Sequence, residues 1–124
     1  MIVDSTILVD LVNGKPAAKD FLLAHETLAT SRVNVMELLF GSRSKKELRG
    51  FLKQFSALKL EVVEISESIS KLAGSLLEKH VLSHRLGVAD ALIAATALVR
   101  EEELVTHNVK HFKPIKGLNL TVPY

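Results

Sequence analysis

Three carboxylates of this chain stand among apolar residues, where burying an unpaired charge is costly. Asp4 directly follows two β-branched residues in MIVDST, Glu37 lies inside VNVMELLFG, and Asp90 opens the segment VADALIAATALV. The other acidic residues occupy visibly charged stretches of the sequence. Each of the three carboxylates therefore needs a local explanation, which is either structural or chemical.

The structural explanation differs among the three. Asp4 and Asp90 each precede or open a predicted helix, so either side chain could cap helix amides or favour the positive end of the helix dipole. Glu37 stands beyond the first turn of its helix, which excludes capping. An exposed or hydrogen-bonded glutamate is the structural interpretation that remains for it.

The chemical explanation is a divalent cation. Three carboxylates in one pocket repel, and at about 6 Å with an effective dielectric constant of about 20 each pair costs roughly 3 kcal/mol. Raised pKa values or a bound cation relieve this repulsion. Because oxygen ligands without Cys or His favour Mg²⁺ or Mn²⁺ over Zn²⁺, we expect magnesium, with manganese as an alternative. A magnesium ion held by few carboxylates keeps waters that can be deprotonated or can bridge to a phosphate.

The elements around these residues alternate between short apolar strands and helices. We expect helices at residues 5–12, 17–24, 32–40, 45–58, 67–81 and 88–101, with Ser31, Ser44 and Ser66 as caps. We expect strands at residues 2–4, 27–30, 60–65 and 104–106, and a further one at 118–122. With no hairpin signal, this order predicts an α/β fold: a three-layer α/β/α sandwich around a short, mainly parallel sheet of four to five strands.

This order also predicts where the carboxylates lie. Asp4 ends the first strand, Glu37 follows the second strand by a turn or two, and Asp90 begins the helix before the fourth strand. In a doubly wound sheet these positions lie at the same end of the sheet, where ligands bind. We therefore predict that the three side chains converge.

Length and composition limit the classes of protein. The 124 residues predict a single domain, 1–124, and 48% hydrophobic residues exclude intrinsic disorder. The lack of cysteine excludes disulfides, thiolate zinc sites and a cysteine nucleophile. With one Tyr and no Trp, base stacking is not expected as the main binding device. No apolar run approaches the ~20 residues of a membrane span, and MIVDST carries no basic leader, so we expect a cytoplasmic protein without membrane association.

The net charge is only +2, but basic residues gather at 32–59 and again from residue 107 onward. Such asymmetry permits a polyanionic partner, although solvated helix faces or a protein contact explain it equally well. Arg43, Arg85 and Lys110 are the best candidates for contacts to RNA phosphates, because they flank the segments that carry the carboxylates.

Four segments, in order, resemble the motifs of the PIN-domain ribonucleases, specifically the VapC-type toxins of toxin–antitoxin pairs. The segments are MIVDSTILVDLV, VNVMELLFGSR, VADALIAATAL and LVTHNVKHF, and the resemblance covers essentially the whole chain. It implies metal-ligand roles for Asp4, Glu37 and Asp90. It also implies a fourth catalytic position at Asn108, two residues after Thr106.

The fourth position departs from the family pattern. Many relatives carry Asp at or near it, and an amide oxygen binds magnesium or its waters less strongly than a carboxylate does. One tightly bound metal, with a second recruited by the substrate, is compatible with Asn108. As a structural alternative, Asn108 forms a turn after the strand. Thr6 and Thr106 would tune the ligands by hydrogen bonds, or alternatively serve in capping and strand packing.

The resemblance implies a magnesium-dependent endoribonuclease. In this family a metal-activated water attacks the RNA phosphodiester in line, leaving 5′-phosphate and 3′-hydroxyl ends. It further implies a homodimer and a cognate antitoxin whose C-terminal segment occupies the acidic groove. One alternative is a catalytically weak PIN-like binding module that acts through RNA or protein contacts, which Asn108 makes conceivable. A second alternative is a phosphorylatable receiver-type domain, but this chain lacks the paired acids after the first strand and the lysine after a late strand that such a domain needs.

The five histidines are the remaining residues that could bind a metal or take part in chemistry. His107 and His111 have the spacing of zinc ligands on a helix, but we expect them in a loop, as surface residues. His84, close to Asp90 in the sequence, is a further functional candidate. We expect His25 and His80 at helix ends.

Overall fold

Five short parallel strands form the centre of the computed structural model, which describes residues 1–124. In chain order they are β1 (Ile2–Val3), β2 (Ala29–Ser31), β3 (Glu61–Val63), β4 (Leu104–Val105) and β5 (Leu120–Thr121). The spatial order is β3-β2-β1-β4-β5, and every neighbouring pair is parallel. The predicted parallel sheet of four to five strands is therefore confirmed.

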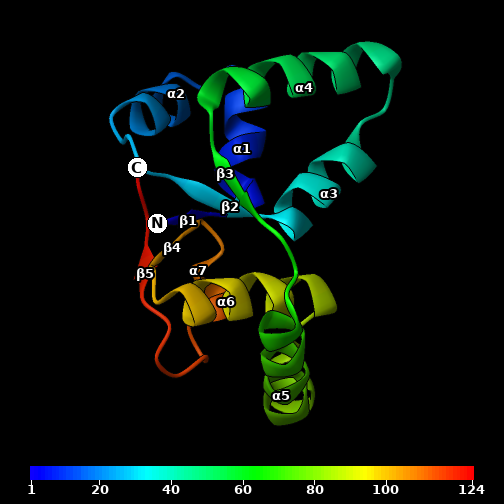
Figure 1. Cartoon of the computed structure of the whole chain (residues 1–124), viewed down its shortest axis with the longest axis vertical. Helices are drawn as coiled ribbons and strands as arrows, with labels where there is room; N and C mark the ends of the chain where they lie inside the picture. Colours follow the sequence, from blue (N-terminus) through cyan, green and yellow to red (C-terminus); the bar gives the residue numbers. More distant parts are fainter.

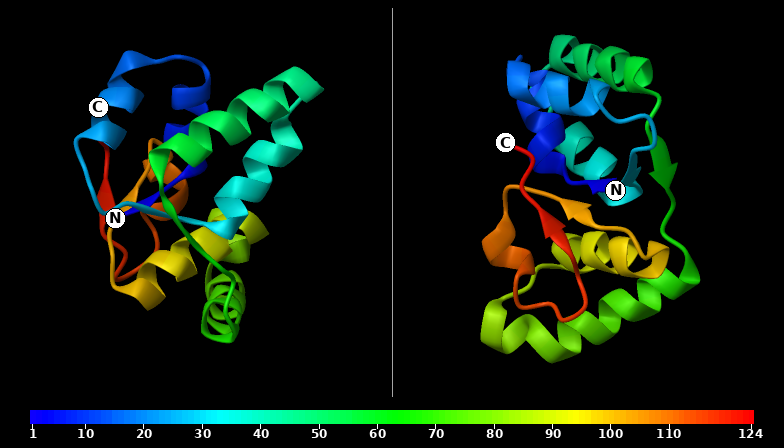
Figure 2. Two further views of the ribbon diagram at one scale, coloured as in Figure 1. Left: turned by 45° about the horizontal axis from the view of Figure 1, so that its top comes forward. Right: turned by 90° about the vertical axis from the view of Figure 1, so that its left-hand side faces the viewer.

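Seven helices surround the sheet, and together they give the predicted three layers. They are α1 (Ser5–Val12), α2 (Pro16–Leu23), α3 (Arg32–Gly41), α4 (Lys45–Leu58), α5 (Glu67–His84), α6 (Val88–Arg100) and α7 (Val109–Phe112). Helices α1, α2 and α4 cover one face, whereas α5, α6 and α7 cover the other (Figures 1 and 2). None of these helices combines the length and the apolar run needed to cross a membrane.

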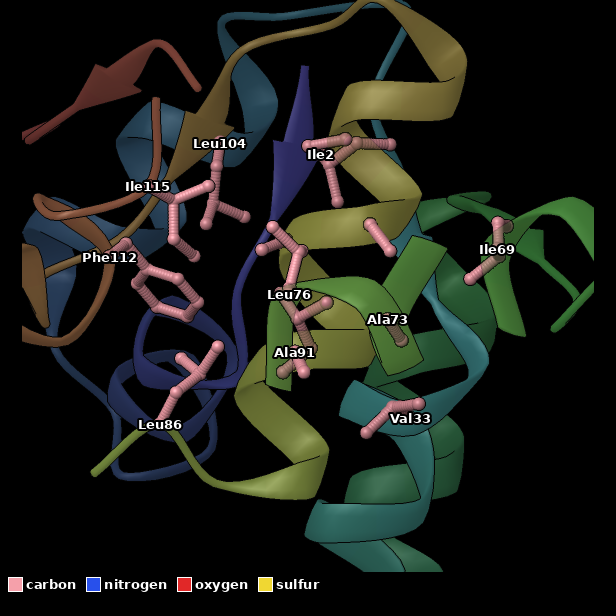
Figure 3. Close-up of a cluster of buried hydrophobic side chains, with 14 of the residues drawn as sticks. Ile2, Val33, Ile69, Ala73, Leu76, Leu86, Ala91, Leu104, Phe112 and Ile115 are labelled. Carbon is pink, nitrogen blue, oxygen red and sulfur yellow. The ribbon is translucent and has the colours of Figure 1, made fainter. Parts of the chain in front are cut away.

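The sheet separates two apolar cores because side chains alternate along each strand. Ile2 and Leu104 point into the larger core, which α5 and α6 complete (Figure 3). Val3 and Val105, the next residues of the same strands, point into the smaller core with α1 and α2. All four side chains are fully buried, so the register of β1 against β4 is fixed on both faces.

Helix α6 is held rigidly beneath the sheet. Four of its five alanines are fully buried, and they pack in the larger core with Ala73 and Leu76 of α5. Small side chains let the two helices approach closely, and α5 with α6 forms the most extensive helix pair of the fold. The packing of α6 against α5 therefore fixes the position of the first turn of α6, which carries Asp90.

The predicted serine caps are confirmed. The hydroxyl oxygens of Ser31, Ser44 and Ser66 accept hydrogen bonds from helix amides two or three residues ahead. Ser31 is at once the last residue of β2 and the cap of α3, so the chain passes from strand to helix without a loop. This direct passage sets the position of α3 at the edge of the sheet.

Several predicted boundaries are wrong, and the sheet explains most of them. The second strand begins at Ala29 instead of residue 27, because Ala29 pairs with Ile2 and β1 offers no earlier partner. The third, fourth and fifth strands are also shorter than predicted, because each pairs with a neighbouring strand of only two or three residues. Helix α5 continues past residue 81 to His84, because no breaker intervenes before Arg85 adopts a left-handed conformation. The short helix α7 replaces an expected loop.

Candidate active site

The candidate site lies at the carboxyl edge of the sheet, where the strand order reverses. The chain leaves β1 toward β2 and β3 on one side and later adds β4 and β5 on the other. Asp4 follows β1 and Thr106 follows the neighbouring β4. Helix α3 leaves β2 at this edge, and α6, which runs back toward β4, begins here. Such a switch point is the usual ligand site of a parallel sheet.

Asp4 is buried, with 2% of its surface exposed, and its carboxylate is held by two hydroxyls. Thr106 Oγ1 donates a hydrogen bond to Asp4 Oδ2 at 2.7 Å, and Thr6 Oγ1 donates to the same oxygen at 3.3 Å. Asp4 occupies the N-cap position of α1, yet its side chain accepts no capping hydrogen bond. The cap of α6 is Gly87 and not Asp90. Capping therefore explains neither aspartate.

Burial raises the pKa of Asp4 above its ordinary value of 3.8, because desolvation disfavours the charged form. The hydrogen bond from Thr106 and the nearby amide of Ser5 oppose this rise in pKa, and the negative charge of Asp90 adds to it. The hydrogen bonds only partly offset the cost of burying the Asp4 carboxylate. A bound cation would stabilise its negative charge further.

Glu37 stands at the open side of the site and is partly exposed to solvent. Ser5 Oγ donates a hydrogen bond to Glu37 Oε1 at 3.2 Å, which ties α3 to the residue that follows Asp4. Partial burial raises the pKa of Glu37 above 4.5, and the charges of Asp4 and Asp90 raise it further. The exposed-glutamate interpretation is therefore incomplete, because the side chain is electrostatically coupled to both aspartates.

Asp90 lies in the first turn of α6 and is half-buried. The helix dipole favours its negative charge at this position. His111 Nδ1 lies 3.2 Å from Asp90 Oδ2. His111 was expected in a loop, but it belongs to α7, and the short helix turns its ring toward Asp90.

The two threonines connect Asp4 to the turn after β4. Thr106 Oγ1 accepts a hydrogen bond from the Asn108 amide at 2.9 Å, and Thr6 Oγ1 accepts one from the His107 amide at 3.2 Å. Each hydroxyl thus donates to the carboxylate and accepts from the backbone. Asn108 itself is exposed at the N-cap position of α7, and its side chain makes no capping bond.

The donor chemistry fits a hydrated magnesium or manganese ion. Asp4, Glu37, Asp90 and Asn108 offer oxygen ligands. The pKa values of Asp4 and Glu37 are raised mainly by burial, and the charges of the neighbouring acids add to the rise. No three acidic or histidine side chains of this structure come together as a direct metal cage. Magnesium is usually bound through one or two carboxylates and keeps several waters, so this spacing suits magnesium better than a tetrahedral zinc.

The three basic candidates differ in their relation to the site. Arg43 lines a groove of about 680 Å³ together with Glu37 and Lys46, and its guanidinium pairs with Glu47 at 3.8 Å. Lys110 is exposed on α7, two residues beyond Asn108. Arg85 is exposed at the end of α5 and makes no ion pair. Arg43 therefore shares a groove with one of the carboxylates, Glu37.

The remaining histidines follow the predictions in part. His25 lies just beyond α2 as expected, and its Nδ1 donates to Phe21 O. His80 is buried inside α5 and not at a helix end. The ring of His84 lies tilted against that of His80, with 5.4 Å between the centroids, and the histidine that lies beside Asp90 is His111. His107 is half-buried, with Nε2 3.7 Å from Asp10 Oδ2.

Sequence reasoning missed Asn34, which is fully buried. Its side-chain amide bonds to the Val3 carbonyl and the Ser5 amide, on either side of Asp4. The available signal was an amide side chain inside the apolar segment VNVMELLFG, three residues before Glu37 and thus on the same face of the helix.

Comparisons with known proteins agree with this geometry. The PIN domain family model matches residues 1–117. Ribonuclease VapC19 of Mycobacterium tuberculosis is 40% identical over 117 residues, which cover 90% of each chain.

Two solved structures share the fold. A toxin–antitoxin complex from Klebsiella pneumoniae superposes with a TM-score of 0.78 at 31% identity, covering 99% of this chain and 97% of the other. VapBC2 from Rickettsia felis, bound to a DNA fragment from its promoter, gives a TM-score of 0.80 at 28% identity, with 97% and 96% covered. The chain therefore belongs to the PIN domain family, in its VapC-type branch.

Proposed function

We propose that this chain is a magnesium-dependent endoribonuclease and the toxin of a toxin–antitoxin pair, acting as a single domain of residues 1–124. The observation that carries the proposal is the placement of three carboxylates at the switch point of the sheet: Asp4 follows β1, Asp90 lies in the first turn of α6, and Glu37 is joined by a hydrogen bond to Ser5, the residue after Asp4. The names of the relatives support it, since VapC19 is a ribonuclease and the Klebsiella structure is a toxin–antitoxin complex.

Asp4, Asp90 and Glu37 would hold the cation, Mg²⁺ or alternatively Mn²⁺, and Asn108 would supply a weaker oxygen ligand. When bound, such a cation supplies charge neutralisation, a water of lowered pKa and stabilisation of the leaving 3′-oxygen. The protein supplies the orientation of the ligands. Thr106 and Thr6 both hold Oδ2 of Asp4, which leaves Oδ1 free of hydroxyl partners.

Glu37 is suited to handle a water. Ser5 holds Oε1 of Glu37, so Oε2 remains free to orient a water molecule or to accept its proton. In the metal-free chain, burial raises the pKa of Glu37 above its ordinary value of 4.5.

The substrate we propose is RNA. The groove beside Glu37 carries Arg43 and Lys46, which would contact phosphates without reading sequence. Arg85 and Lys110 are further candidates for phosphate contacts. An RNA substrate is consistent with action in the cytoplasm. Raising the salt concentration should weaken RNA binding steeply, and a flat response would exclude a role for these cations.

A protein partner is supported by the apolar surface of α3. Met36, Leu39 and Phe40 are exposed, and Phe40 exposes 94% of its surface. Exposed apolar surface of this kind marks interaction sites. We propose that a cognate antitoxin and a second copy of the chain cover this helix and α1.

The decisive test is cleavage of RNA by the purified chain with and without Mg²⁺. We expect magnesium-dependent cleavage that is lost in Asp4→Asn and Glu37→Gln. Glu67→Gln is the matched control, because Glu67 is an exposed acid whose side chain pairs only with Lys71. Cleavage by Asp4→Asn at the parent rate would refute the assignment of the site.

The alternative is a catalytically weak binding module. Asn108 in place of the family's acid, together with the loose spacing of the acids, favours this reading. RNA binding without magnesium-dependent cleavage would support it over the nuclease.

A further inference from the structure

Asn34 makes more structural hydrogen bonds than any other side chain near the candidate site. It lies in the first turns of α3 and is fully buried. Nδ2 donates to the Val3 carbonyl at 3.0 Å and to Thr30 Oγ1 at 3.1 Å, while Oδ1 accepts from the Ser5 amide at 3.1 Å. Both amide protons and the oxygen are thus satisfied by the ends of β1 and β2 and the start of α1.

These bonds reach the two peptide groups that flank Asp4. A side-chain amide has the donor and acceptor of a peptide group, so Asn34 acts here like a residue of a neighbouring strand. The register between β1 and β2 contains one residue pair, Ile2 with Ala29. Asn34 bonds the Val3 carbonyl at the end of β1 and the Ser5 amide at the start of α1, beyond the point where that pairing ends. Thr30 Oγ1 of β2 donates to the same Val3 carbonyl at 2.7 Å.

The other two backbone groups at Asp4 are fixed as well. The Asp4 amide donates to the Val105 carbonyl at 2.9 Å, and the Asp4 carbonyl accepts from the Ile7 amide at 3.1 Å. The Asp4 carboxylate makes no capping hydrogen bond to α1, and the first amide of that helix donates to Asn34 Oδ1. The carboxylate is left available to a ligand.

Asn34 also relates Asp4 to Glu37. Glu37 lies three residues further along α3, on the same side of the helix as Asn34. Ser5 joins both, since its amide donates to Asn34 Oδ1 and its hydroxyl donates to Glu37 Oε1. The spacing between the two carboxylates is therefore determined through one buried amide.

We propose that Asn34 is a positioning residue that fixes the backbone of Asp4 and its distance from Glu37, and thereby sets the affinity for the divalent cation. This inference rests on the proposed metal-dependent function. Asn34 touches neither the cation nor the substrate, so it acts only through the two carboxylates. Removing a group that orients metal ligands typically weakens metal binding by about 10–100-fold.

The test compares Asn34→Leu, which has similar size and no polar atoms, with the parent chain and with Thr96→Val. Thr96 is equally buried, but its hydroxyl donates only to Leu92 O within α6. Mn²⁺ affinity is measured by calorimetry without RNA, and exchange of the Ser5 amide proton is followed by NMR. Circular dichroism verifies the fold, and Asn34→Ser replaces Asn34→Leu if the latter does not fold.

We expect Asn34→Leu to weaken Mn²⁺ binding by about tenfold or more and to accelerate exchange at Ser5, with Thr96→Val within about twofold of the parent. At saturating metal, the loss in cleavage should appear in kcat and not in the KM for RNA. An affinity of Asn34→Leu within twofold of the parent, or an equal loss in Thr96→Val, would overturn this inference alone. A parent chain that binds no Mn²⁺ would overturn the proposed function, and the inference with it.

Discussion

Replacing Thr106 by Val tests how strongly the protein restrains Asp4. Thr106 is fully buried, and its hydroxyl donates the shortest hydrogen bond to the carboxylate, at 2.7 Å. Valine has nearly the same shape, so packing is preserved while the donor is lost. Hydrogen bonds to charged groups contribute about 1.5–3 kcal/mol, and the buried oxygen loses its strongest partner. We therefore expect the free energy of unfolding at about pH 8 to fall by roughly 2 kcal/mol.

The loss should depend on pH. The hydrogen bond from Thr106 lowers the pKa of Asp4, so its removal raises that pKa further. At low pH the Asp4 carboxyl is neutral, so Thr106→Val removes a hydrogen bond between neutral groups. The free energy of unfolding should then fall by only about 1 kcal/mol. For a chain of this size, a loss of 2 kcal/mol corresponds to a melting temperature lower by about 6–12 °C.

The assay is thermal and urea denaturation of metal-free protein, followed by circular dichroism at about pH 8 and at about pH 3, which lies below the ordinary pKa of an aspartate. Thr96→Val is the matched control, because it removes a buried hydroxyl whose acceptor is a neutral carbonyl. Its effect should be smaller and equal at both pH values. If Thr106→Val behaves like the control, the hydroxyl of Thr106 does not restrain a charged Asp4, and the reasoning is refuted.

Three further predictions concern stability. Asp4→Asn should raise the melting temperature of the metal-free chain, because it removes a buried charge whose pKa is raised; differential scanning fluorimetry showing a lower melting temperature would contradict this. In the folded chain the pKa values of Asp4 and Glu37 are raised above 3.8 and 4.5, their ordinary values. The folded chain therefore holds these protons more tightly than the unfolded chain, and this contribution to stability is present in full at low pH. Glu61, Glu64 and Glu102 have lowered pKa values and contribute in the opposite direction, so the comparison is made with the variant in which Asp4 and Glu37 are both amides. Relative to that variant, urea titrations should show the stability of the parent chain falling as pH rises from below 3.8 through the raised pKa values. Arg100→Gln should lower the free energy of unfolding by up to about 1 kcal/mol, because Arg100 bonds Glu61 and Glu102 at a half-exposed site; an effect that persists unchanged in high salt would argue against ion pairing.

Much of this fold follows from local signals in the sequence. Ser31, Ser44 and Ser66 predict three helix starts because capping is a property of neighbouring residues. The apolar pair before Asp4 predicts a buried strand, and the alternation of strands and helices predicts a parallel sheet. The rule that ligands gather where parallel strands end then predicts the neighbourhood of Asp4, Glu37 and Asp90, although their role as metal ligands stays a prediction.

Other features depend on partners that are distant in the sequence. The start of β2 at Ala29 is set by the length of β1, which no residue near position 29 records. The contact of His111 with Asp90 requires α7, a helix of four residues that is too short to show a periodic pattern. The role of Asn34 becomes visible only when β1 is placed beside α3, because a buried amide and an exposed one look alike in the sequence.

The central claim is that folding gathers three carboxylates into one site for a divalent cation. Anomalous diffraction from crystals of the full chain soaked in Mn²⁺ tests this claim most directly. We predict a single strong peak bounded by Asp4, Glu37 and Asp90, with a carboxylate oxygen of Asp4 or Asp90 at direct coordination distance, and no peak there in Asp4→Asn. A manganese ion bound elsewhere, or none at the carboxyl edge of the sheet at saturating Mn²⁺, would contradict the account.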